Sequence, residues 1–253
     1  MFVTLSRSCY QLMIFLGCTL VMVGCSYDND LGPNELLFAS PVQMADLAAT
    51  VWEEVKERET LIAEGADFDR VLRVTSKIIE AAHQEQDDWA VVILDQEKSV
   101  AFALPNRQIA ISKGVLGLAQ NDDQLAALVS HLVAHINYNH PGERYSQSPL
   151  AKNGFTARGI ARAYDRDPRA VEEILGLETS DGQWVPYSRA HSLTADKFGI
   201  RYMKRAGFDP TEAVAFWTKL AHGAGEASTQ VELHPVDNTR LRRLEQEIQL
   251  IGD

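Results

Sequence analysis

A short stretch of β-forming residues, with helical patterns on both sides, is the feature of this sequence that most restricts its fold. Three runs, 89–94, 100–104 and 108–112, are rich in Val, Ile, Leu, Ala and Phe and are separated by polar or Pro-Asn turns. Runs of this length and composition are typical of strands. They predict a small three-stranded sheet inside a chain that is otherwise mostly helical.

Apolar residues at helical spacing occupy most of the remaining chain. Ser40 places a capping hydroxyl before Pro41, which predicts a helix over about 41–63, and a second helix begins near Asp67. After the sheet we expect helices over 123–140, about 154–164, about 168–176, about 188–206, 210–222 and about 236–250. Helices that follow a sheet in this way indicate an α+β domain, which we assign to residues 39–253.

The first residues have the build of a signal peptide. Arg7 is followed by an apolar run from Leu12 to Val23, and polar residues begin at Ser26. The run is shorter than the about 20 residues that a spanning helix needs. An export signal is therefore expected rather than a membrane span.

The end of this run resembles the bacterial lipobox, in which a cysteine is diacylated and becomes the mature N-terminus. The matching residues are 22–25, with Cys25 as the lipidated cysteine, and no cysteine follows it in the chain. The resemblance implies a lipoprotein signal peptide at 1–24, a lipidated tether at 25–38 and, from Ser26, export to the outer membrane. Cys18 is a second candidate, and an ordinary secretory signal with an incidental cysteine is the alternative.

Charge excludes one class of partner. The formal net charge is −11, with 24 Lys and Arg against 35 Asp and Glu, and the cations are scattered along the sequence. Nucleic-acid binding requires a continuous basic surface, so no nucleic acid is expected as a partner.

Two histidines four residues apart are the first candidates for chemistry. Residues at this spacing share one face of a helix, so His131 and His135 can direct both imidazoles at one point. Zinc proteases use this spacing, with a glutamate after the first histidine as general base. That position holds Leu132, and without further context a chance pair is the alternative reading.

Three ordered motifs supply that context. They are the strand 99–105 with the histidine helix 123–135, the segment 187–199, and His234-Pro235 with Arg240 and Leu244. Together they resemble the M48 metallopeptidase family. The resemblance implies a zincin-like metallopeptidase domain and a polypeptide as substrate or client.

The same resemblance exposes two losses. The family's general base falls on Leu132 and its third zinc ligand, a glutamate, on Ser192. Asp196, expected to support the ligands from behind, is retained, although it could instead pair with a Lys or Arg of the helix layer. His234 matches a histidine thought to assist at the reacting carbonyl. His191 is a candidate substitute ligand, but it starts about 100° away around the helix.

These residues are compatible with three functions. The first is a degenerate metallopeptidase, anchored as an outer-membrane lipoprotein facing the periplasm, that binds or chaperones extended polypeptides. The second is an active zinc metalloendopeptidase with an altered site, built from His131, His135 and His191, that cleaves misfolded envelope proteins. The third is a metal-binding or sensing protein without hydrolysis. Zinc is expected to bind weakly or not at all, and no pattern indicates an oligomeric state.

Overall fold

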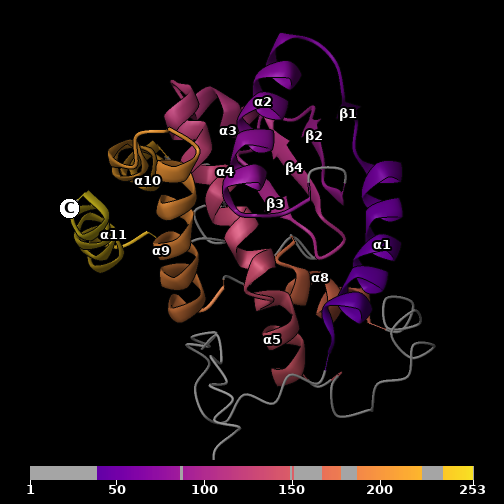
Figure 1. The fold of residues 1–253 in the computed structure, drawn as a ribbon. Coiled ribbons are helices and arrows are strands. Elements are labelled where there is room, and N and C mark those ends of the chain that lie inside the picture. The colour runs from indigo at the N-terminus through magenta and orange to yellow at the C-terminus, as the bar shows by residue number, and fades with distance from the viewer. Residues whose placement is uncertain are drawn as a thin grey trace, which may run out of the picture. The chain divides into compact units, whose positions relative to one another are not determined.

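The computed structural model describes residues 39–85, 88–148, 150, 167–177, 187–223 and 236–252 (Figure 1). The chain divides into two compact units, Met1–Asn34 and Glu35–Asp253, and every described residue belongs to the second. The expected signal peptide, the tether with Cys25, the helix expected at 154–164 and His234 lie outside the described residues. No helix in the described ranges is both long and apolar enough to cross a membrane.

One mixed sheet forms the centre of the domain, with its strands in the order β1-β2-β4-β3 (Figure 1). β2 and β4 are parallel, whereas β1 and β3 pair antiparallel at the two edges. The bounds are Leu61–Ile62 for β1, Ala90–Leu94 for β2, Ala101–Ala103 for β3 and Gln108–Ser112 for β4. The α+β prediction is confirmed, and the three predicted strands are β2, β3 and β4.

The prediction of only three strands was wrong, because β1 lies where the first helix was expected to continue. That helix, α1, spans Pro41–Arg58 and ends at Glu59, whose backbone is extended. Leu61 and Ile62 then pair with Leu94 and Ile93 of β2. Two residues are too few to show the alternation by which strands are predicted.

Eight further helices are described in the remaining ranges of the structure. They are α2 (Ala66–Ala81), α3 (Lys113–Leu118), α4 (Asp122–Asn137), α5 (His140–Gln147), α8 (Pro168–Leu175), α9 (Arg189–Arg205), α10 (Thr211–Gly223) and α11 (Asn238–Gly252). The single helix expected over 123–140 is divided at Asn139, which has a positive φ of 52°. Because Pro141 lacks an N–H, it is tolerated only near the start of a helix, so a new helix begins at His140.

Buried apolar side chains form two clusters on opposite faces of the sheet. Ile109 and Ile111 of β4 belong to the first, with residues of α2, α4, α9 and α10. Ala110 of β4 and Phe102 of β3 belong to the second, with residues of α1, α5 and α8. Because successive side chains of β4 point to opposite faces of the sheet, this one strand contributes residues to both cores.

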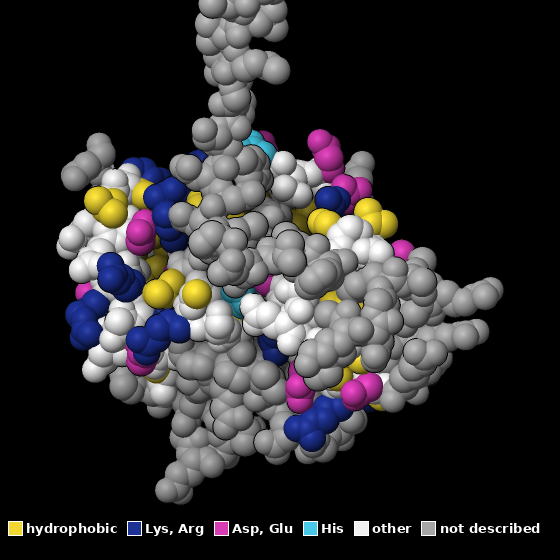
Figure 2. Space-filling model, turned by 90° about the horizontal axis from the view of Figure 1, so that it is seen from below, with side chains coloured by type: hydrophobic (Ala, Val, Ile, Leu, Met, Phe, Trp, Pro, Cys, Tyr) yellow, Lys and Arg dark blue, Asp and Glu magenta, His cyan; other side chains and the backbone are white. Residues whose placement is uncertain are grey.

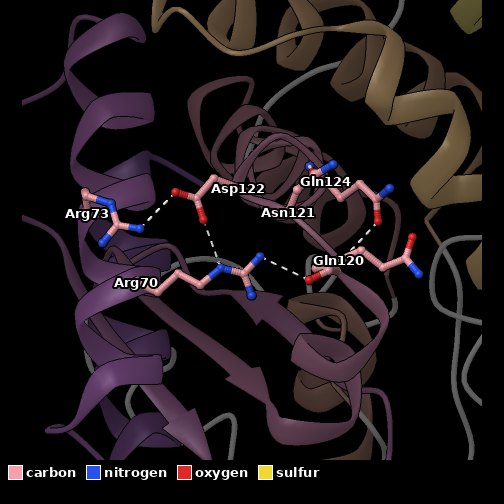
Figure 3. Close-up of polar contacts among 7 residues, drawn as sticks. Arg70, Arg73, Gln120, Asn121, Asp122 and Gln124 are labelled. Carbon is pink, nitrogen blue, oxygen red and sulfur yellow. Dashed lines mark hydrogen bonds and ion pairs between the residues drawn. The ribbon is translucent and has the colours of Figure 1, made fainter.

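Helix α4 is fixed at its first turn by contacts to α2 (Figure 3). The Asn121 side chain caps the helix by accepting the N–H of Gln124 at 2.8 Å. Asp122 accepts from Arg70 at 2.9 Å and from Arg73 at 2.8 Å, and Arg70 also donates to the Ala119 carbonyl. These bonds fix the start of the helix that carries the histidine pair.

Candidate functional site

The two predicted histidines converge in the interior of α4. His131 and His135 are buried, and their Nε2 atoms lie 3.0 Å apart. Helical spacing places both rings on one face, as the sequence predicted. The two imidazoles are therefore brought together in the fold.

Asp196 of α9 supports the first histidine from behind. Its Oδ1 lies 2.9 Å from His131 Nδ1, and Arg240 of α11 donates to both carboxylate oxygens at 2.7 and 2.8 Å. The Arg240 guanidinium also stacks 4.3 Å from the Trp217 ring. Burial alone would raise the pKa of Asp196, but Arg240 and the bond to His131 outweigh it and hold that pKa well below its usual range. Asp196 thus makes both contacts that the sequence suggested, one to the histidine and one to an arginine.

His140 contacts Nδ1 of the second histidine, His135, as Asp196 contacts Nδ1 of the first. Its Nδ1 lies 2.8 Å from His135 Nδ1, and its side chain is buried at the start of α5. Helix α4 ends at Asn137, so His140 belongs to the first turn of the next helix. Burial lowers the pKa of His140 to about 2, so its imidazole is neutral near pH 7.

One assignment of protons satisfies this row of rings. His131 carries its proton on Nδ1, beside the Asp196 carboxylate, and its Nε2 accepts from Nε2–H of His135, whose Nδ1 in turn accepts from Nδ1–H of His140. All three rings are then neutral, in keeping with burial lowering the pKa of His131 despite the bond to Asp196. If both Nε2 atoms held a metal, His135 would need the opposite tautomer. Its hydrogen would then lie on Nδ1 and be donated in a hydrogen bond to His140 Nδ1.

His191, the candidate substitute ligand, has a different partner. Its Nε2 lies 2.7 Å from Oε2 of Glu143 on α5, and its ring stacks on His140 with the centroids 4.5 Å apart. Tyr187 lies against His135, with ring centroids 4.0 Å apart. Glu143 was missed in the sequence because no helix was predicted at 140–147 and no motif includes it.

The two replaced positions are both closed to solvent. Leu132 is buried in the core of the first cluster, and it has no atom that can accept a proton. Ser192 is also buried, and its Oγ has no hydrogen-bond partner. Burying a hydroxyl without a partner costs about 1–3 kcal/mol, so Ser192 lowers the stability of the fold at this position.

The donor set of the described residues does not fit a complete catalytic zinc site. M48 metallopeptidases are typically zinc-dependent, and catalytic zinc normally has three protein ligands. Two histidine nitrogens converge here, and Ser192, where the family resemblance implies the third ligand, has a hydroxyl. Among the described residues, no group of three His, Cys, Asp or Glu is arranged to hold a metal ion.

The terminal strand of the sheet, β3, is a second candidate site, although its residues are buried. β3 is the terminal strand on one side of the sheet, and the ladder bonds to β4 flank it at Val100 and Leu104. In an antiparallel ladder the intervening residues turn their main-chain groups outward, here Ala101 and Ala103. A cavity of about 510 Å³ lies at the following turn, where Pro105 faces Pro41 and Val42 of α1.

Comparison with known proteins agrees with this arrangement. The model of peptidase family M48 matches residues 66–248. Mitochondrial metalloendopeptidase OMA1 of Schizosaccharomyces pombe is 27% identical over 180 residues, which cover 70% of this chain and 51% of the relative. The beta-barrel assembly-enhancing protease of Escherichia coli is 22% identical over 173 residues, covering 65% and 35% respectively. The chain thus spans about half or less of the length of these curated relatives.

Proposed function

Because the chain belongs to peptidase family M48, we propose that it retains the peptidase scaffold, has lost hydrolysis and binds extended polypeptides. The observation that carries the proposal is the pair of buried replacements, Leu132 and Ser192, beside an otherwise intact histidine pair. Removing a positioned general base costs a factor of about 10² to 10⁴ in rate. The loss of an anionic ligand lowers zinc affinity as well.

Polypeptide binding requires neither missing group. Ala101 and Ala103 are buried, with 7% and 5% of their surface exposed, so an extended chain can add a strand at their outward main-chain groups only when the atoms that cover this edge move aside. Val42, with 71% of its surface exposed, and Pro105 line the nearby cavity and provide apolar contacts for a client side chain. Backbone pairing of this kind accepts many sequences, as a chaperone requires.

We also propose that the domain lies in the bacterial cell envelope, where lipidated Cys25 holds it at the outer membrane, facing the periplasm. The signal-like residues 1–24 and the lipobox resemblance support this placement. The Escherichia coli relative is named for beta-barrel assembly. An unfolded β-rich envelope protein is a client that would suit a sheet edge.

A second candidate function is an active metalloendopeptidase with an altered site. The buried pair of His191 and Glu143 favours it, since a carboxylate lies 2.7 Å from an imidazole close to the histidine pair. Asp196 also holds His131 in the orientation that metal ligands need. In this case the chain would cleave misfolded envelope proteins.

Restoring the two lost carboxylates separates the two functions. Full-length protein is purified in detergent, its zinc content is measured, and cleavage of unfolded casein is followed with and without chelator. We expect the unaltered chain to be inactive, and the double variant Leu132→Glu with Ser192→Glu to gain zinc and chelator-sensitive cleavage. The matched control, Leu132→Gln with Ser192→Gln, has the same shape without charge and should gain neither. Chelator-sensitive cleavage by the unaltered chain would establish the second function instead.

Binding of the client is tested at the sheet edge. Ala103→Pro removes an outward N–H without breaking a bond to β4, so the affinity for labelled unfolded casein should fall. Ala103→Val keeps the N–H and should bind as the unaltered chain does. Unfolding midpoints of both variants show whether a loss of binding is merely a loss of fold. Equal affinities in folded variants would remove β3 from the proposal.

A further inference from the structure

Positive charge is concentrated on two helices of an acidic protein. α9 carries five Lys and Arg against one Asp, and α11 carries three Arg against two Glu, so together they hold a net charge of +5. Since the whole chain carries −11, the remainder carries −16. The cations that are scattered in sequence gather in the fold on the flank of α9, α10 and α11, to the left in Figures 1 and 2.

The two helices lie side by side and run in the same direction. Arg201 Nη2 lies 3.5 Å from Glu247, and Lys204 donates to the carbonyl of Ile251. Lys197 and Arg243 line one cavity of about 250 Å³. Residue numbers rise together along this contact, so successive turns of α9 are matched to successive turns of α11. The two rows of cations therefore lie next to each other.

Four of the eight cations on α9 and α11 have no carboxylate partner among the described residues. These four, all exposed, are Lys204, Arg205, Arg242 and Arg243. Their contacts are with neutral groups: Arg242 donates to Thr239, Arg243 to Gln246, and Arg205 lies over the Tyr202 ring. We call Lys197, Lys204, Arg205, Arg242 and Arg243 the basic face.

An apolar side chain accompanies the basic face. Leu250 of α11 has 69% of its surface exposed, and it lies seven residues after Arg243, on the same side of the helix. Lysine and arginine beside an exposed leucine are typical of helices that rest on a membrane surface. Acidic proteins would match the charge but leave Leu250 unexplained.

We propose that the basic face docks onto an anionic phospholipid surface, with the cations at the headgroups and Leu250 inserted between them. A partner of this kind goes beyond the proposed function and does not depend on the state of the histidine site. Each cation near such a surface contributes about fivefold to binding. Docking would hold the domain against the bilayer in one orientation.

Lysine footprinting tests the proposal on the full-length chain. The protein is reconstituted in nanodiscs of phosphatidylglycerol with phosphatidylethanolamine, or of phosphatidylcholine alone, and amine acetylation is followed by mass spectrometry. In the anionic discs we expect Lys197 and Lys204 to label about fivefold more slowly, and in about 1 M salt, where the Debye length is about 3 Å, to lose this protection. Lys56 and Lys113, each with a 42% exposed side chain, serve as internal controls and should label equally in both discs.

A pair of matched variants removes the same charge from two places. Arg242→Gln with Arg243→Gln should abolish most of the protection of Lys197 and Lys204, whereas Lys56→Gln with Lys113→Gln should preserve it. Equal labelling of Lys197 and Lys204 in the two kinds of disc would overturn the proposal. So would protection by soluble polyglutamate without protection by anionic discs, which would identify an acidic protein as the partner.

Discussion

Burial of His140 links the stability of the domain to pH. The imidazole is neutral in the folded protein because its pKa is lowered to about 2, whereas its ordinary pKa is 6.5. Below pH 6.5 the unfolded chain therefore takes up a proton that the folded chain does not. Stability from this group is complete above pH 6.5 and is lost as pH falls toward 2.

The first prediction concerns this residue. Between pH 6.5 and 4 the free energy of unfolding should fall by about 1.4 kcal/mol per pH unit for one such histidine. His140→Asn keeps an N–H for His135 but cannot titrate, so its urea-unfolding curves should show a shallower dependence on pH. The control His83→Asn alters an exposed histidine at a positive φ of 56°, which asparagine tolerates. An unchanged pH dependence in His140→Asn would contradict the burial of a neutral ring.

Sequence patterns identified part of the site for reasons visible at single residues. His131, Leu132, His135, Ser192 and Asp196 fall within motifs, so their positions could be read before the fold was known. His140 and Glu143 are brought to the site by α5, whose short length and early Pro141 give no clear helical period. The contact of Arg240 with Asp196 joins residues 44 apart, and only the packing of α11 on α9 creates it.

At the scale of elements, α4 and α9 lie close together at Gly199. A Cβ at this position would lie 3.1 Å from Ser130 Oγ and 3.2 Å from the backbone nitrogen of His131. The absent side chain thus allows α9 to bring Asp196 up to the histidine turn. The close approach also constrains what position 199 can hold.

The second prediction compares two helical glycines. Gly199→Ala gains about 1 kcal/mol of helix propensity but overpacks the crossing by about 1–3 kcal/mol, so a net loss of about 1 kcal/mol is expected. In the control, Gly117→Ala in α3, a Cβ would meet nothing within 4 Å, so a gain of up to about 1 kcal/mol is expected. Urea unfolding measures both. A stabilised Gly199→Ala would show that the helices can separate freely.

The third prediction concerns the first turn of α4. The hydrogen bond from Arg73, aided by Arg70, holds the pKa of Asp122 below its usual 3.8 despite partial burial. Asp122→Asn should lower stability at neutral pH by less than about 1 kcal/mol, because the side chain is 39% exposed and water screens the pairs. The charged form gives this stability above pH 3.8, and it is lost as pH falls through the lower folded pKa. The difference from the unaltered chain should therefore shrink in acid, whereas Asp46→Asn on α1 should change little at any pH.

Element boundaries show which parts of the fold local pattern can determine. The helices expected at about 188–206 and at 210–222 occur at Arg189–Arg205 and Thr211–Gly223, since each has a clear apolar face and a capping or turn signal. β1 and α3 were not predicted. They are only two and six residues long, and they form because neighbours in the sheet and Ser112 as an N-cap stabilise them.

At the scale of the whole domain, β4 joins the two cores and should make them unfold together. Trp52 reports on the second cluster and Trp217 on the first. The fourth prediction compares Trp52→Phe, which keeps Trp89 and Trp217 of the first cluster, with Trp89→Phe plus Trp217→Phe, which keeps Trp52 of the second. The fluorescence of both should give unfolding transitions that coincide with circular dichroism. Separate midpoints for the two probes in either variant would mean that the cores are independent units.

Arg240 has a consequence for the order of events during biosynthesis. The carboxylate that orients His131 is held by an arginine encoded more than one hundred codons after the histidine. During translation, His131 leaves the ribosome long before the residue on which its orientation depends. The histidine row can therefore reach its final arrangement only after Arg240 has been synthesised, so it forms later than the contacts within α4 itself.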